Sequence, residues 1–68
     1  MPNYCVNKNA QSTGEHEVHK DTCTFLPDKE NRINLGSCIT CQEAIVKARK
    51  YYDNVDGCFY CIPECNKK

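Results

Sequence analysis

Seven cysteines and two histidines are the residues of this chain with the most distinctive chemistry. Two of the cysteines, Cys58 and Cys61, form a Cys-x2-Cys pair directly after Gly57. This spacing places two thiolates on one tight turn, about one edge of a zinc tetrahedron apart. A glycine just before the pair suits a backbone that must turn sharply. The pair therefore predicts half of a zinc site.

Three sets of residues could supply the other half. The first is His19 with Cys23, at His-x3-Cys spacing, which would complete a Cys3His site with Cys58 and Cys61. His16 competes with His19 for the histidine position. If residues 15–20 form a strand, the two rings point to opposite faces, so only one of them can enter the site.

The second set is Cys38 with Cys41, because a Cys-x2-Cys-x16-Cys-x2-Cys pattern is typical of zinc proteins. The third combines Cys65 with His16. Buried cysteines commonly pack as small apolar side chains, and this ordinary role argues against both the second and the third ligand set. We expect Cys5, Cys38, Cys41 and Cys65 to pack in the interior rather than to bind metal.

A Cys3His site leaves no open coordination position, so we predict a structural Zn²⁺ and no enzymatic activity. His16 and His19 do not form the His-Glu-x-x-His motif of zinc proteases, which needs histidines four residues apart on one helical face. The alternative is a thiol redox or disulfide-stapled protein that uses Cys38 and Cys41, since a helix N-terminus lowers the pKa of a thiol.

The order of these landmarks resembles the Ada-like metal-binding module of alkylation-repair proteins. The resemblance rests on five segments: Tyr4 to Asn9, His19-x3-Cys23, Asn34-Leu35, Thr40 to Ala44, and Gly57-Cys58-x2-Cys61-x-Pro63. It implies the ligands His19, Cys23, Cys58 and Cys61. The chain also resembles small stand-alone bacterial proteins with a Gly-Glu-His-Glu-Val-His segment. Because His19 stands where the repair protein has its methyl-accepting cysteine, the methyl-transfer reaction is not implied.

Short strands and one helix must position these side chains. Alternation of apolar and polar residues predicts strands at residues 3–8 and 15–20, and Ile33 with Leu35 predicts a third that stops at Gly36. Residues 9–14 and 27–31 have turn composition. Together with the helix, these strands predict an α+β domain over residues 1–68: a short antiparallel sheet, one C-terminal helix, and zinc joining them.

An amphipathic stripe predicts the helix at residues 41–53. Thr40 and Glu43 form a capping box, Ile39 could staple onto Ala44, and Glu43 with Lys47 makes a favourable pair. The stripe consists of Cys41, Ala44, Ile45, Ala48, Tyr52 and Val55.

Composition narrows the class of protein and of partner. A chain of 68 residues has a marginal core and usually needs a staple. Nine basic and nine acidic residues give no net charge, whereas nonspecific nucleic-acid binding needs a cationic face. No apolar leader follows Met1 and no segment is long enough to span a membrane. We therefore expect a cytoplasmic, monomeric protein that binds a protein or a nucleic acid.

Overall fold

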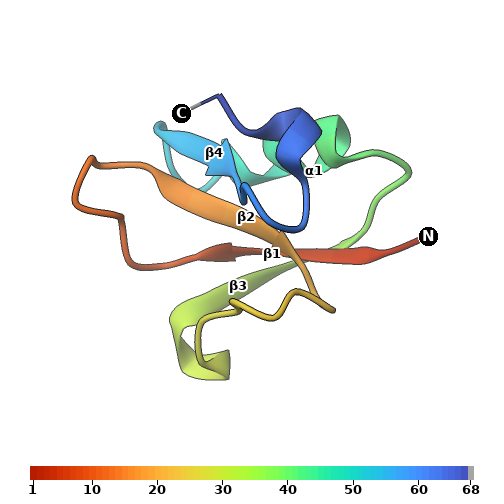
Figure 1. Cartoon of the computed structure of the whole chain (residues 1–68), viewed down its shortest axis with the longest axis horizontal. Coiled ribbons are helices and arrows are strands. Elements are labelled where there is room, and N and C mark those ends of the chain that lie inside the picture. Colours follow the sequence, from red (N-terminus) through yellow and green to blue (C-terminus); the bar gives the residue numbers. More distant parts are fainter. Residues whose placement is uncertain (68) are drawn as a thin grey trace.

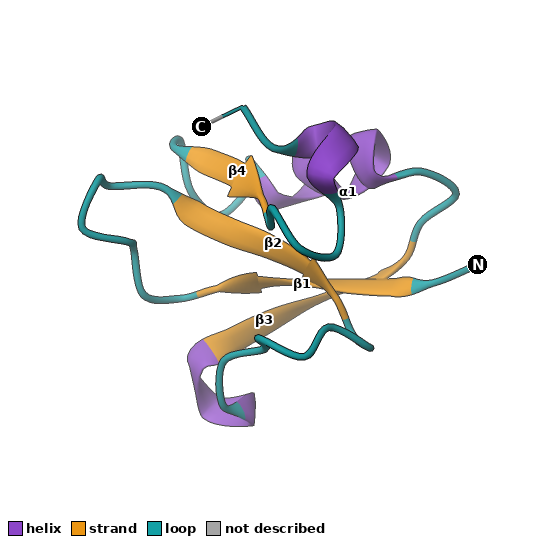
Figure 2. Ribbon diagram, viewed as in Figure 1, coloured by secondary structure: helices purple, strands orange, loops and turns teal. Residues whose placement is uncertain are grey.

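Four short strands and one helix form the secondary structure of residues 1–67, the part of the chain that the computed structural model describes (Figure 2). The strands are β1 (Asn3–Asn7), β2 (His16–Lys20), β3 (Arg32–Ser37) and β4 (Val55–Gly57). The helix α1 spans Cys41–Ala48, and two 3₁₀ turns lie at Lys29–Asn31 (η1) and Pro63–Cys65 (η2). The α+β class and the three predicted strands are confirmed, and β4 is an additional strand.

The four strands form one sheet in the order β3-β1-β2-β4 (Figure 1). β1 pairs antiparallel with β2 and with β3, but β2 and β4 run parallel. The three predicted strands form the expected antiparallel sheet, and the additional strand β4 makes the whole sheet mixed. A parallel neighbour requires a long connection rather than a hairpin, and the chain between β2 and β4 contains β3 and α1.

The helix differs from its prediction in length and in place. α1 ends at Ala48 instead of residue 53, and it lies in the middle of the chain because β4 and η2 follow it. Beyond Ala48 the backbone tightens: the Tyr51 N–H donates to the Ala48 carbonyl at 2.9 Å, three residues back. Tyr52 then stacks on His16 of β2, with ring centroids 3.6 Å apart. This contact turns the chain toward β4 and off the helix axis.

The helix N-terminus largely follows its predicted signals. The Thr40 hydroxyl accepts a hydrogen bond from the Glu43 N–H at 3.2 Å, and the Glu43 carboxylate lies 4.0 Å from Lys47. The hydrophobic staple is wrong, because Ile39 is 75% exposed. Instead its N–H donates to the Glu43 carboxylate at 2.8 Å.

The core lies between the sheet and α1. Val6 and Val18 are neighbours in the β1–β2 register and are fully buried, as are Ala44 and Ala48 of the helix. Small helix residues let the helix approach the sheet closely. Since side chains alternate along a strand, His19 lies on the opposite face from Val18. Within residues 1–67, no helix has the length and apolarity needed to cross a membrane.

A disulfide between Cys41 and Cys65 joins the start of α1 to η2. Both residues are buried, as expected, and the disulfide is an addition to that expectation. The disulfide alternative, which used Cys38 with Cys41, is wrong in its pairing. Cys38 is a free, fully buried thiol instead. The cross-link supplements a core that is thin at this chain length.

Replacing both bonded cysteines, in Cys41→Ala/Cys65→Ala, should lower the free energy of unfolding by about 3 kcal/mol, because the unfolded chain loses a cross-link that closes a loop of this size. Urea denaturation of the metal-loaded protein measures the loss. Cys38→Ala is the matched control, since it removes a buried sulfur without a cross-link. Equal losses per sulfur in the two variants would contradict a stapling role.

Candidate metal centre

Two segments far apart in the sequence meet at the predicted site. His19 lies in β2, and Cys23 lies in the turn that follows, where its N–H donates to the Lys20 carbonyl at 3.1 Å. Cys58 follows β4, and its N–H donates to the Val18 carbonyl at 2.9 Å. This bond extends the parallel β2–β4 pairing by one residue. It sets Cys58 beside His19, the residue after Val18.

The Cys58–Cys61 segment forms the tight turn that its spacing predicts. The Ile62 N–H donates to the Cys58 carbonyl at 3.0 Å, which closes the turn around both sulfurs. Gly57 leads into it at a place where no side chain fits, since a Cβ there would lie 2.8 Å from the Cys65 backbone. The glycine is therefore required for close packing against η2.

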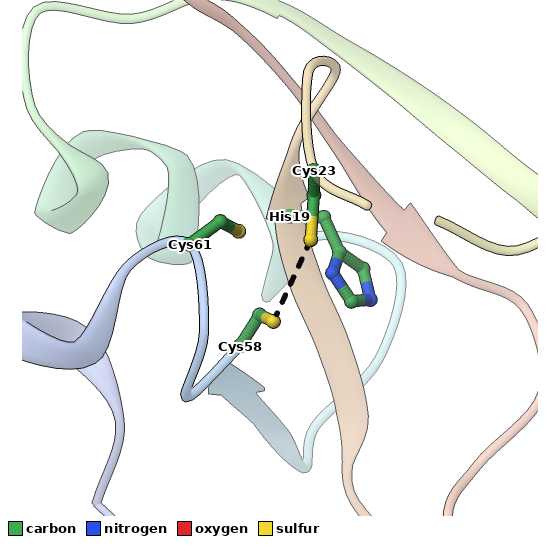
Figure 3. Close-up of side chains that lie close together, drawn as sticks. All are labelled: His19, Cys23, Cys58 and Cys61. Atoms are coloured by element: carbon green, nitrogen blue, oxygen red, sulfur yellow. Dashed lines mark hydrogen bonds between the residues drawn. The ribbon is translucent and has the colours of Figure 1, made fainter. Parts of the chain in front are cut away.

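The four predicted ligands converge. Figure 3 shows the side chains of His19, Cys23, Cys58 and Cys61 pointing toward one another, and their ligand atoms all lie within 4.8 Å of each other. The Cys23 and Cys58 sulfurs are 3.8 Å apart. A tetrahedral ion with metal–sulfur bonds of about 2.3 Å has an edge of about this length. The group is close enough to hold a metal ion.

His19 contributes a nitrogen that has no other partner. The residue is 2% exposed, and its Nδ1 has no hydrogen bond to any described residue. In Figure 3 one ring nitrogen faces the sulfurs. Its Nε2 lies 3.6 Å from the Glu17 carboxylate, two residues back on the same face of β2. A carboxylate behind a histidine is the usual outer partner of a metal-bound imidazole.

Backbone N–H groups support two of the sulfurs. The Lys20 N–H donates to Cys61 Sγ at 3.3 Å, and the Phe25 N–H donates to Cys23 Sγ at 3.4 Å. Such bonds stabilise the negative charge of a thiolate and fix its direction. The sequence could not reveal Glu17 or these N–H groups as outer partners, because their positions depend on the tertiary fold.

Burial favours the neutral forms of Cys61 and His19. Burial raises the pKa of the Cys61 thiol to about 12, although the Lys20 N–H acts against this shift. Burial also lowers the pKa of His19, and the charge of Arg32 lowers it further. A neutral imidazole is the form that binds metals, and a bound metal displaces the thiol proton. Three sulfurs and one nitrogen suit a borderline or soft divalent ion in tetrahedral geometry.

The competing residues lie elsewhere. His16 stacks on Tyr52, and its Nδ1 lies 2.9 Å from the Asn7 carbonyl, so the competition between the histidines ends in favour of His19. Cys41 and Cys65 are bonded to each other, which excludes the second and third ligand sets. Cys5 and Cys38 are buried free thiols, as expected.

Replacing His19 should remove metal binding, whereas replacing His16 should not. Loss of an outer partner typically costs 10- to 100-fold in metal affinity, so we expect at least 100-fold for His19→Ala. His16→Ala is the matched control, because it removes an identical side chain from the same strand. Titration with Co²⁺, followed by its visible absorption, measures both affinities. Equal affinities in the two variants would exclude His19 as a ligand.

No known family model, curated protein or solved structure matches this chain. The Ada-like family therefore stays a resemblance in the order of landmarks, and the function must be argued from the site itself.

Proposed function

We propose that this chain is a small, monomeric, non-enzymatic zinc protein whose Cys3His centre is structural and whose metal-binding loops display a surface for another protein. The observation that carries the proposal is the convergence of His19 and three cysteines from β2 and from the segment after β4. Zinc is the ion that this donor set fits best, because Cys3His is a common composition of closed zinc sites.

The site supports a structural role rather than a hydrolytic one. A catalytic zinc keeps one position open for water, whereas four protein ligands fill a tetrahedron. The ligands also join β2 and its following turn to the segment after β4, so the free energy of metal binding would become free energy of folding. In small peptides this amounts to about 10–16 kcal/mol, against roughly 3–5 kcal/mol from a core of this size.

Thiol redox catalysis at Cys38 and Cys41 is less well supported. Cys41 is bonded to Cys65, so it is not paired with Cys38. Cys38 is a fully buried free thiol. A redox thiol needs partial exposure and an electropositive setting. The Cys41–Cys65 disulfide therefore supports a disulfide-stapled protein, but it does not support thiol redox catalysis.

Three exposed aromatic side chains lie on the two metal-binding loops. Phe25, Phe59 and Tyr60 are 58–69% exposed, and we call them the aromatic cluster. The Phe25 and Tyr60 ring centroids are 4.4 Å apart, and those of Phe59 and Tyr60 are 5.5 Å apart. Phe59 and Tyr60 stand between the ligands Cys58 and Cys61, so a bound metal fixes the loop that carries them.

A protein is the partner that the aromatic cluster supports best. Tyrosine and phenylalanine are enriched in protein interfaces and supply much of their binding energy. Nucleic-acid binding draws its affinity from many cationic contacts to phosphate, whereas this chain has no net charge.

Removal of zinc should unfold the protein. A strong chelator is expected to abolish the chemical-shift dispersion of its amide NMR spectrum, and added Zn²⁺ should restore it, because the remaining core and disulfide are insufficient. Native mass spectrometry of the untreated protein identifies the ion. Cys58→Ser should lose the metal while Cys5→Ser retains it. Full dispersion after chelation would refute a structural zinc.

Removal of the aromatic cluster should abolish partner binding without loss of metal. A photo-crosslinking phenylalanine analogue placed at Tyr60 identifies the partner, whose affinity is then measured with the purified proteins. Phe59→Ser/Tyr60→Ser should weaken binding at least tenfold, since buried aromatic anchors carry interface energy. Tyr51, which is 55% exposed outside the loops, provides the control Tyr51→Ser.

Two results would overturn the assignment of this surface. One is equal cross-linking from positions 60 and 51. The other is salt-dependent binding of an oligonucleotide by the aromatic cluster, which would make nucleic acid the partner.

A further inference from the structure

A polar hollow of about 400 Å³ lies on the sheet face opposite α1. Cys5, only 5% exposed, lines it, and in the sheet register Cys5 stands between Asn34 of β3 and His19 of β2. The hollow therefore adjoins the metal centre but contains none of its four ligands. Its lining includes Asn3, Cys5, Asp21, Lys29, Arg32 and Asn34.

Two cations of the hollow have no side-chain partner in the part of the chain that the structure describes. Among residues 1–67, the side chains of Lys29 and Arg32 make no hydrogen bond or ion pair. Arg32 is half-buried. Burial raises the pKa of the Cys5 thiol while the Arg32 guanidinium acts in the opposite direction, which indicates that this charge lies near the thiol. A half-buried guanidinium that forms no ion pair with a described residue is available to bind an anion.

Two amides add further donors. The Asn34 Oδ1 accepts a hydrogen bond from the Gly36 N–H at 2.9 Å, and the Asn3 Oδ1 accepts one from the Ser37 hydroxyl at 3.3 Å. Each amide oxygen is thus occupied, and each NH₂ group is left to donate. The hollow presents four donor groups against one carboxylate, that of Asp21.

We propose that this hollow binds the oxyanion, phosphate or carboxylate, of a small polar molecule. Arg32 holds two oxygens of the anion through its planar fork, and Lys29 adds a second positive charge. The amides of Asn3 and Asn34 donate to the remaining oxygens or to hydroxyl groups of the ligand. The Asp21 carboxylate repels the anion and limits its affinity. This site does not depend on the identity of the metal or on the aromatic cluster.

Amide NMR titration of the full chain with inorganic phosphate and, separately, acetate tests the proposal. We expect saturable shifts confined to the strands and turns that line the hollow, with phosphate and acetate distinguishing the two oxyanion sources. Arg32→Gln should weaken binding on the order of tenfold, as expected for loss of a charge-assisted hydrogen-bonding group. Arg49→Gln, at the residue directly after α1, is the matched control, with the same change of charge outside the hollow.

Asp21→Asn provides the second test, because it should strengthen binding, and a misfolded variant cannot gain affinity. No saturable shift with either anion would overturn the proposal. Equal losses in Arg32→Gln and Arg49→Gln, or weaker binding by Asp21→Asn, would also overturn it.

Discussion

The hydrogen bond from the Cys58 N–H to the Val18 carbonyl is the contact on which the site depends. It attaches the segment after β4 to β2, in parallel, at the level of His19. A parallel pair must be closed over a long connection, so its entropy cost is high and few bonds offset it. The β4 strand has three residues, Val55–Gly57, and it would be a weak edge alone. A metal bound by residues of both segments would hold β2 and the segment after β4 together beside this short pairing.

Two staples act on this one region in different ways. The Cys41–Cys65 disulfide holds η2 against the start of α1, while a metal bound by the four candidate ligands would hold the preceding turn against β2. Gly57 connects their effects, because it lies against the Cys65 backbone and directly precedes Cys58. Four cysteines follow Ile39. Cys41 and Cys65 form the disulfide, and Cys58 and Cys61 are candidate metal ligands. Neither staple requires Cys38, whose burial contributes only packing.

The sequence predicted the features that depend on local chemistry. Cys-x2-Cys spacing, the Thr40 cap and period-two strands act within a few residues, and all are present. The pairing of Cys41 with Cys65 escaped prediction because disulfide connectivity depends on the fold rather than on spacing. β4 was missed because three residues offer no periodicity, and Tyr52 fitted the helical stripe although its stack on His16 bends the chain away.

The division of the cysteines bears on the compartment of the protein. A disulfide is typical of oxidising compartments. A metal bound at the centre would protect the ligand thiolates from oxidation, because each sulfur would share a lone pair with the ion. The Cys23 and Cys58 sulfurs, 3.8 Å apart, would otherwise be well placed to react with each other. A metal at the centre would therefore make the site compatible with oxidising conditions, under which a disulfide such as Cys41–Cys65 persists.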